Sequence, residues 1–230
     1  IMFVLLGVYF FAFQYIVRYR HDLSIPMLSL LYDQCDPQAC ASALIYYSKQ
    51  GRHYRLQQRT VLAQCLIYMD EPEMAQDVMV AYPRKDRPSN LLYWSIMSYI
   101  YYLLKDETSL ERCKEEIENI RVGRASAGVI VLDKELKAVN NKINLMNGEL
   151  NQCKKYYLEA TRGAVFPYQS VDASYYIGLI SFVQQDYMVA KFYFERVVAL
   201  GNKMSFVQKA KKYLDKLNEM DLDETISDEG

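Results

Sequence analysis

Strand-forming stretches, glycine and proline are all scarce in this chain. It has 230 residues but only nine glycines and six prolines, and runs rich in Val, Ile and Thr are few, so helices are expected rather than a sheet. Neither sign of charge dominates, because 27 basic and 28 acidic side chains give a formal net charge of −1. No overall field would draw such a chain to nucleic acid or to acidic lipid.

Residues for catalysis or metal binding are also few. The two histidines, His21 and His53, stand outside any motif, and no G-x-S-x-G, H-E-x-x-H or P-loop sequence occurs. The five cysteines are irregularly spaced, with no CxxC pair, and their odd number does not suggest a disulfide framework. We therefore expect no enzyme activity, no cofactor and no metal, and we expect the cysteines to be small buried side chains.

The first seventeen residues, IMFVLLGVYFFAFQYIV, contain no charged side chain. As a helix they would extend roughly 25 Å, near the lower limit for crossing a bilayer. We expect a membrane-spanning helix here, and because the segment opens on Ile1 we expect it to be clipped. Arg18, Arg20 and His21 follow at once, which favours a cytoplasmic location for the rest of the chain. Residues 1–21 are thus interpreted as a membrane segment with a basic flank.

A pattern of small and large residues recurs along the rest of the chain. Small residues occur 35, 38, 40 and 37 residues apart, and a large apolar residue follows each of them by four positions. The small residues are Cys40, Ala75, Cys113, Cys153 and Ala190, and the large ones are Leu44, Met79, Ile117, Tyr157 and Phe194. This spacing places both on one helix face. It predicts five repeated units, in which the small residue admits a partner helix.

Signals for helix ends recur in the same phase. Glycines expected to adopt the left-handed conformation that ends a helix are Gly51, Gly123, Gly163 and Gly201. Residues expected to cap the start of the second helix in a unit are Asp36, Asp70, Thr108 and Asp186. Each unit is therefore predicted to be a helix-turn-helix.

The pattern resembles that of the tetratricopeptide repeat (TPR) family. It is carried most closely by Ile177-Gly178 followed by Tyr187, Ala190, Phe194 and Val197. A divergent member is indicated, because the units exceed that family's usual 34 residues. The resemblance implies an all-α fold, a right-handed superhelical solenoid of about five helix-turn-helix repeats within residues 22–218. A helix over 205–220 would cap it, and the acidic tail, 219–230, is expected to be disordered.

In the TPR family the concave face, lined by the first helix of each unit, binds partners. Projecting the phase onto this chain gives a candidate groove of Gln57, Thr60, Gln64, Ser98, Tyr102, Lys105, Lys134, Lys137, Asn141, Asn144, Tyr175, Leu179 and Phe182. Lys137 and Asn141, one turn apart, are similar to the Lys/Asn pairs that hold a peptide carboxylate in chaperone-binding members. An ordinary solvated helix face is the alternative interpretation of these positions.

The resemblance and the apolar N-terminus together suggest a membrane-tethered scaffold. Its groove would bind a peptide segment or a partner protein near the bilayer. Two alternatives remain open: a regulatory protein that senses a small peptide, or the C-terminal soluble domain of a larger polytopic membrane protein whose activity lies upstream of Ile1.

Overall fold

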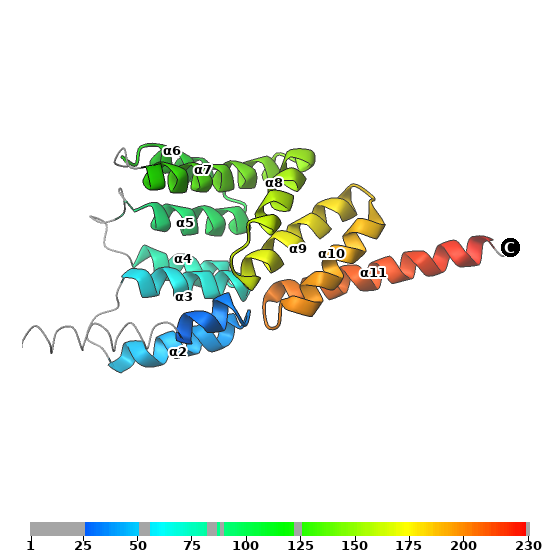
Figure 1. Ribbon diagram of the computed structural model, residues 1–230, viewed down its shortest axis with the longest axis horizontal. Helices are drawn as coiled ribbons and strands as arrows, with labels where there is room; N and C mark the ends of the chain where they lie inside the picture. Colours follow the sequence, from blue (N-terminus) through cyan, green and yellow to red (C-terminus); the bar gives the residue numbers. More distant parts are fainter. Residues whose placement is uncertain (1–25, 51–55, 82–86, 88–89, 122–125, 229–230) are drawn as a thin grey trace, which may run out of the picture.

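The chain is helical in the part that the structure describes. This computed structural model describes residues 26–50, 56–81, 87, 90–121 and 126–228 (Figure 1). A helical segment, 26–32, precedes α2 (Pro37–Gln50), α3 (Leu56–Tyr68), α4 (Pro72–Val80), α5 (Leu91–Leu104), α6 (Glu107–Glu118), α7 (Ser126–Met146), α8 (Leu150–Arg162), α9 (Pro167–Val183), α10 (Tyr187–Leu200) and α11 (Ser205–Asp228). No strand occurs in these ranges, so the expected all-α class is confirmed.

The predicted membrane segment, 1–17, and its basic flank lie outside the described residues. Within the described ranges, no helix combines the length and apolar character needed to cross a bilayer. At the other end of the chain, the backbone of α11 is helical through Asp228. This backbone helix extends past residue 219, where the acidic tail was expected to begin, and the tail's side chains from residue 221 on lie outside the described residues.

Five tight turns join the helices in pairs. Each turn contains one residue with positive φ: Cys35, Asp70, Lys105, Gly148 and Gln185. In each turn the next residue's N–H donates to a carbonyl of the preceding helix, at 2.8 to 2.9 Å. A left-handed residue with such a bond ends a helix and satisfies its last carbonyls. The second helix of the pair then begins two residues after the left-handed position.

The turns correct the caps expected from the sequence. The residue between the left-handed position and the second helix is acidic in every pair: Asp36, Glu71, Asp106, Glu149 and Asp186. Asp36 and Asp106 accept backbone N–H groups of their own first turns, at 2.9 and 3.0 Å. The predicted caps Asp70 and Thr108 lie one position before and two positions after the true ones, because the helix begins where the left-handed residue allows it.

The same turns correct the phase of the third pair. Successive left-handed residues are 35, 35, 43 and 37 positions apart. Five positions after them stand Cys40, Ala75, Leu110, Cys153 and Ala190, all fully buried. Leu110 therefore takes the place predicted for Cys113, which is buried one turn further along. All five cysteines are buried free thiols, as expected.

Two helices end at glycines that do not adopt the predicted left-handed conformation. Gly163 and Gly201 have φ of −90° and −79°, so the predicted left-handed conformation is wrong at both, while Gly51 and Gly123 lie outside the described residues. At Gly201 a Cβ would lie 2.5 Å from Cγ2 of Val207 and 2.6 Å from the carbonyl oxygen of Val197. Gly201 is thus required by close packing rather than by backbone conformation.

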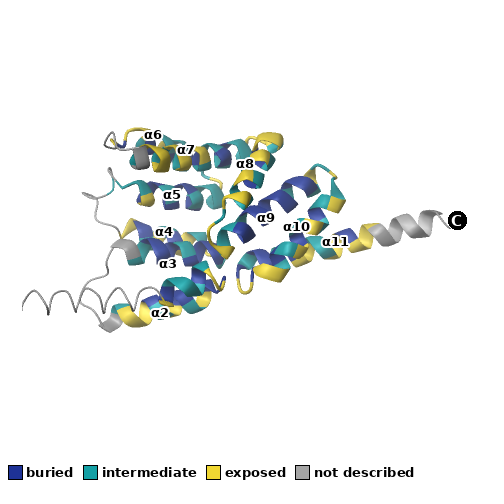
Figure 2. Cartoon of the chain, viewed as in Figure 1, coloured by how far each residue is buried: buried dark blue, intermediate teal, exposed yellow. Residues whose placement is uncertain are grey.

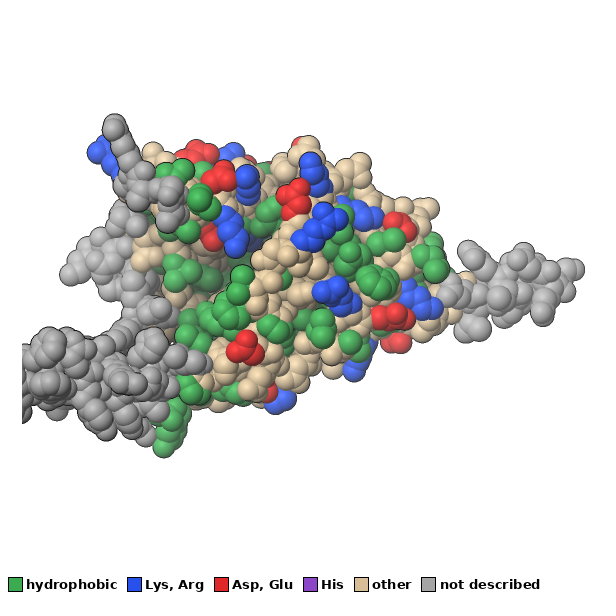
Figure 3. Space-filling view, viewed as in Figure 1, with side chains coloured by type: hydrophobic (Ala, Val, Ile, Leu, Met, Phe, Trp, Pro, Cys, Tyr) green, Lys and Arg blue, Asp and Glu red, His purple; other side chains and the backbone are tan. Residues whose placement is uncertain are grey.

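Helix α9 is the centre of the core. Buried residues lie on most of its sides (Figure 2), and it packs against α8, α10 and α11. The closest approach is to α10, where a Cβ on Gly178 would lie 2.8 Å from the Phe194 ring. The surface outside this core carries hydrophobic and charged side chains of both signs intermixed (Figure 3), in keeping with the near-neutral composition.

The two ends of the helical array touch. Asn202 Nδ2 donates to the Gln34 carbonyl at 2.8 Å, and the Lys203 N–H donates to the Cys35 carbonyl at 3.2 Å. Figure 1 shows α2 beside the loop between α10 and α11. Two ion pairs complete the contact, Lys203 with Asp36 and Lys209 with Asp70. We call this set of contacts the clasp.

Candidate binding pocket

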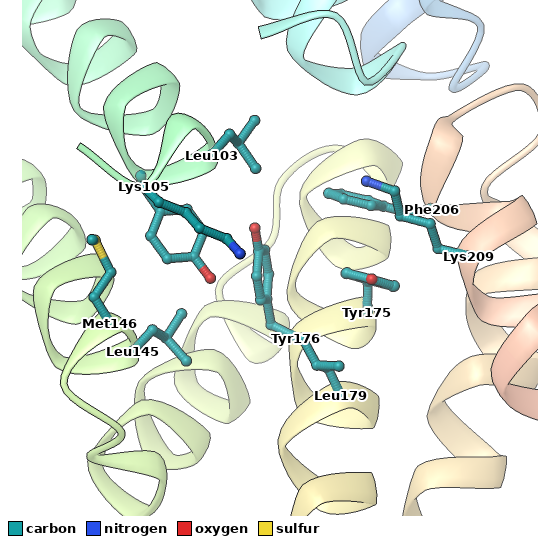
Figure 4. A pocket seen from close by; sticks show the side chains of 10 residues that line it. Leu103, Lys105, Leu145, Met146, Tyr175, Tyr176, Leu179, Phe206 and Lys209 are labelled. Atoms are coloured by element: carbon teal, nitrogen blue, oxygen red, sulfur yellow. The ribbon is translucent and has the colours of Figure 1, made fainter. Parts of the chain in front are cut away.

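A pocket of about 410 Å³ opens where the ends of α5 and α7 meet α9 and the start of α11 (Figure 4). Its volume lies in the range of small-ligand sites, roughly 300 to 1,000 Å³. The lining residues come from helices far apart in sequence: Tyr102, Leu103, Lys105, Leu145, Met146, Tyr175, Tyr176, Leu179, Phe206 and Lys209. Helices of three pairs and the last helix therefore build one site.

Aromatic rings form the wall of the pocket. Tyr175 stacks on Phe206 with centroids 4.4 Å apart and planes 6° from parallel. Tyr176 meets Phe206 edge to face, with centroids 6.0 Å apart, and lies tilted against Tyr102 at 6.1 Å. Because Tyr175, Tyr176 and Phe206 are buried, packing holds these rings in place. Such a wall suits a large apolar or aromatic group of a ligand.

The charged groups lining the pocket are two lysines, and no carboxylate is among its lining residues. Lys105 is the left-handed residue of the third turn, and in Figure 4 its ammonium end and the hydroxyl end of Tyr176 point toward each other. Lys209 extends beside Phe206 from the other side. The pocket therefore combines apolar walls with two cations, a combination that favours an amphipathic ligand carrying negative charge.

Behind the aromatic wall lies a chain of tyrosine hydroxyls that ends at a carboxylate. The Tyr102 ring lies beside Tyr176, with centroids 6.1 Å apart, the Tyr176 and Tyr99 hydroxyls are 3.4 Å apart, and Tyr99 donates to Asp172 at 2.5 Å. Burial raises the pKa of Tyr102 to about 12, so this hydroxyl stays neutral at physiological pH. The pocket wall is thus tied to the interior by hydrogen bonds as well as by packing.

Asp172 belongs to a small group of charges on the inner side of α5, α7 and α9. Burial raises its pKa to about 6, although the Tyr99 hydroxyl and the Lys142 ammonium favour the ionised form. Burial also lowers the pKa of Lys142, whose ammonium lies 5.2 Å from the centroid of the Tyr99 ring. Glu135 accepts a hydrogen bond from Ser95. The charges of Asp172 and Glu135 therefore favour the charged form of Lys142.

Several residues of the predicted groove come together at or beside the pocket. Tyr102, Lys105, Tyr175 and Leu179 line it. Gln64 lies beside Tyr68 and Tyr168, next to the charged group. The repeat phase alone had placed all thirteen residues on one face. Of these, Gln64, Tyr102, Lys105, Tyr175 and Leu179 lie at or beside the pocket.

Other predicted residues lie elsewhere. Thr60 and Ser98 are buried in helix packing, and Phe182 packs against Tyr187 and Tyr213, at 5.8 and 4.9 Å between centroids. The side chain of Gln57 lies outside the described residues.

Helix α7 is rotated relative to its predicted phase. Lys134 and Lys137 are exposed, and Lys137 pairs with Asp133 at 2.7 Å. Asn141 is buried, and Asn144 lies 3.4 Å from the Gln152 side-chain oxygen. Lys137 and Asn141 thus have different environments, one in solvent and one in the core.

The inward positions of α7 follow the predicted ones by a single residue: Glu135, Lys142 and Leu145. The repeat pattern does not single out Glu135, Lys142, Tyr99 or Asp172. Charged residues that recur on a mainly apolar helix stripe could have indicated these positions. On α7 that stripe lies one residue after the predicted groove residues.

Comparisons with protein-family models, curated proteins and solved structures find no match to this chain. The candidate function therefore depends on the pocket and the helix pairs themselves. In the described residues no group of histidine, cysteine and acidic side chains is arranged to hold a metal ion.

Proposed function

We propose that this chain is a membrane-tethered protein–protein interaction scaffold that binds a peptide segment of its partner in the inner pocket. The observation that carries the proposal is the pocket itself, in which Tyr102 and Tyr175 from different helix pairs line one site of about 410 Å³. Apolar walls with a few polar groups at the rim are typical of sites that take a side chain of a bound segment.

The recurrence of one turn geometry in five helix pairs supports a divergent TPR-type fold. Under this proposal the pairs form a right-handed superhelical solenoid, and α11 is its cap. Residues 1–17 would anchor the array in a membrane, with the basic flank favouring the cytoplasmic side. Anchoring raises the effective concentration of any partner that is itself at the membrane.

A peptide-sensing regulator is the second candidate, and a ring contact between α3 and α11 favours it. Phe206 lines the pocket and also contacts Tyr68 of α3, with ring centroids 5.9 Å apart. A ligand in the pocket would therefore touch a residue that helps to hold the two ends of the array together. Thermal stabilisation by short peptides, without a stable protein complex in pull-down, would favour the sensor over the scaffold.

Site-specific photo-crosslinking in intact cells tests the scaffold. A photo-reactive residue at Leu179, in the pocket, is compared with one at Met188, which is 82 % exposed on α10. We expect the Leu179 probe to trap a discrete partner peptide, identified by mass spectrometry, and the Met188 probe to trap none. Capture from Met188 with none from Leu179 would place the binding surface outside the pocket and refute the proposal.

A further inference from the structure

Lys209 belongs to the pocket and to the clasp at the same time. It lines the pocket, and its ammonium pairs with Asp70, the left-handed residue of the turn between α3 and α4. The two side chains are 32 % and 50 % exposed, respectively. An ion pair this open to solvent stabilises the fold little, so another carboxylate can replace Asp70 at small cost.

The second ion pair of the clasp is built differently. Asp36 is only 11 % exposed and lies 2.8 Å from the Lys203 ammonium. Burial alone would raise its pKa, but hydrogen bonds from Lys203 and from the Ala39 amide outweigh burial, and its pKa is lowered. The backbone bond from Lys203 to Cys35 reinforces this side. The Asp36 contact is therefore fixed, whereas the Asp70 contact is exchangeable.

The charge of the lining residues specifies the ligand. Lys105 and Lys209 give the pocket two positive charges with no carboxylate in its lining, and in the described part of the chain Lys105 forms no ion pair. Asp70 reaches Lys209 from outside and supplies the one carboxylate partner. A carboxylate is thus the group that Lys209 already binds.

We propose that the pocket takes a peptide segment with a large apolar side chain beside Asp or Glu, and that this acidic side chain displaces Asp70 from Lys209. This inference rests on the proposed function and names its ligand class. The apolar side chain lies against Tyr175, Tyr176 and Phe206. Release of Asp70 removes the ion pair between the α3–α4 turn and α11, while Asp36 and Lys203 keep the ends joined. Peptide binding and loosening of the clasp are then one event.

Two matched peptide libraries test the proposal on the full chain in lipid nanodiscs. One consists of fluorescent octapeptides with a central Phe, Leu or Met flanked by Asp or Glu, and the other replaces each acid by Asn or Gln. We expect the acidic peptides to bind about tenfold more tightly than their amide counterparts, as one charge-assisted contact implies. Asp70→Asn should raise their affinity about three- to tenfold, because Lys209 no longer has an internal competitor.

Variants on α11 provide the matched control. Lys209→Gln should reduce the preference for acidic peptides to below about twofold, whereas Lys212→Gln, an equal change of charge at an exposed site of the same helix, should leave it intact. Spin labels at Met74→Cys and Gln208→Cys, both exposed, report the clasp directly. Acidic peptides should lengthen the distance between the labels, and amide peptides should not.

Each outcome decides between the two proposals. Equal binding of both libraries, abolished by the pocket-filling variant Leu179→Trp, would overturn the exchange at Lys209 and leave the peptide-binding function standing. Acid-selective binding with an unchanged label distance would overturn the coupling to the clasp. Binding of neither library to any variant that keeps its helical circular dichroism would overturn both proposals.

Discussion

The Asp36 carboxylate lies 2.8 Å from the Lys203 ammonium, joining the first described turn of the chain to the loop before its last helix. The contact is reinforced by backbone and amide bonds between the same segments. The clasp therefore joins the two ends of the array, alongside the ring contacts of Tyr32 with Phe166 and of Tyr68 with Phe206. It makes the stability of the first pair depend on the last helix.

Removing Lys203 should therefore weaken the whole array. We expect Lys203→Ala to lower the free energy of unfolding by about 1–2 kcal/mol, because the mostly buried Asp36 loses a charged hydrogen-bond partner. The pKa of Asp36 is lowered, so its contribution is present above its ordinary value of 3.8 and is lost as the pH falls through the folded-state value. Urea unfolding at pH 7 and at low pH measures this. Lys212→Ala, on the exposed side of α11, is the control, and an equal loss in both variants would contradict the prediction.

Asp172 should make stability depend on pH in the opposite sense. Its pKa is raised from 3.8 to about 6, so the native state binds the proton more tightly than the unfolded state. Stability is then highest below pH 4 with respect to this group and falls as the pH rises through about 6, by up to about 3 kcal/mol. Asp172→Asn should remove this fall while keeping an oxygen for the Tyr99 hydroxyl.

Urea titrations of the Asp172→Asn variant between pH 5 and 7.5 test this. Glu135 remains as a countercharge for Lys142, so we expect the variant to be more stable than the parent at pH 7.5. The exposed Asp133→Asn serves as the control. If the free energy of unfolding of Asp172→Asn depends on pH as that of the parent does, ionising Asp172 costs the native state little, and the prediction is wrong.

Gly178 should tolerate no larger side chain unless Phe194 shrinks. A Cβ at Gly178 lies 2.8 Å from the Phe194 ring, so we expect Gly178→Ala to destabilise the protein by about 1–3 kcal/mol through overpacking. Phe194→Leu should relieve part of that cost, and a double-mutant cycle would show a coupling of opposite sign to the single effects. Gly163→Ala is the matched control, because its Cβ would meet only the Glu159 carbonyl oxygen at 3.6 Å.

Replacing Gln185 with glycine should stabilise the protein. Its φ is 60°, a conformation that costs a residue with a Cβ about 1–2 kcal/mol, whereas glycine loses about 0.5–1 kcal/mol of chain entropy. We expect Gln185→Gly to raise the free energy of unfolding by about 0.5 kcal/mol, measured by urea unfolding. The neighbouring Gln184 has φ of −79° and donates to Asn151 at 2.8 Å, so Gln184→Gly should destabilise. Loss of stability in both variants would contradict the assigned strain.

The shared face of Tyr102, Tyr175 and Leu179 could be predicted from the sequence because helical phase is a local property. The spacing of small and large residues assigns faces on α5 and α9 without knowledge of any neighbour. On α7 the same spacing points to Lys134, Asn141 and Asn144, each one residue before an inward position. An error of one residue rotates a helix face by about 100°, and α7, at 21 residues, offers more than one plausible stripe.

The sequence by itself determined the all-helical class, the five helix pairs and the buried thiols, since these follow from residue spacing and helix-end chemistry within a few turns. Only the tertiary structure decided that Asp36 meets Lys203, that Asp70 meets Lys209, and that Lys209 and Lys105 share a pocket. Those contacts depend on the summed rotations and crossing angles of all the intervening pairs. Each angle is set by side-chain packing at its own interface, and no short stretch of sequence encodes their sum.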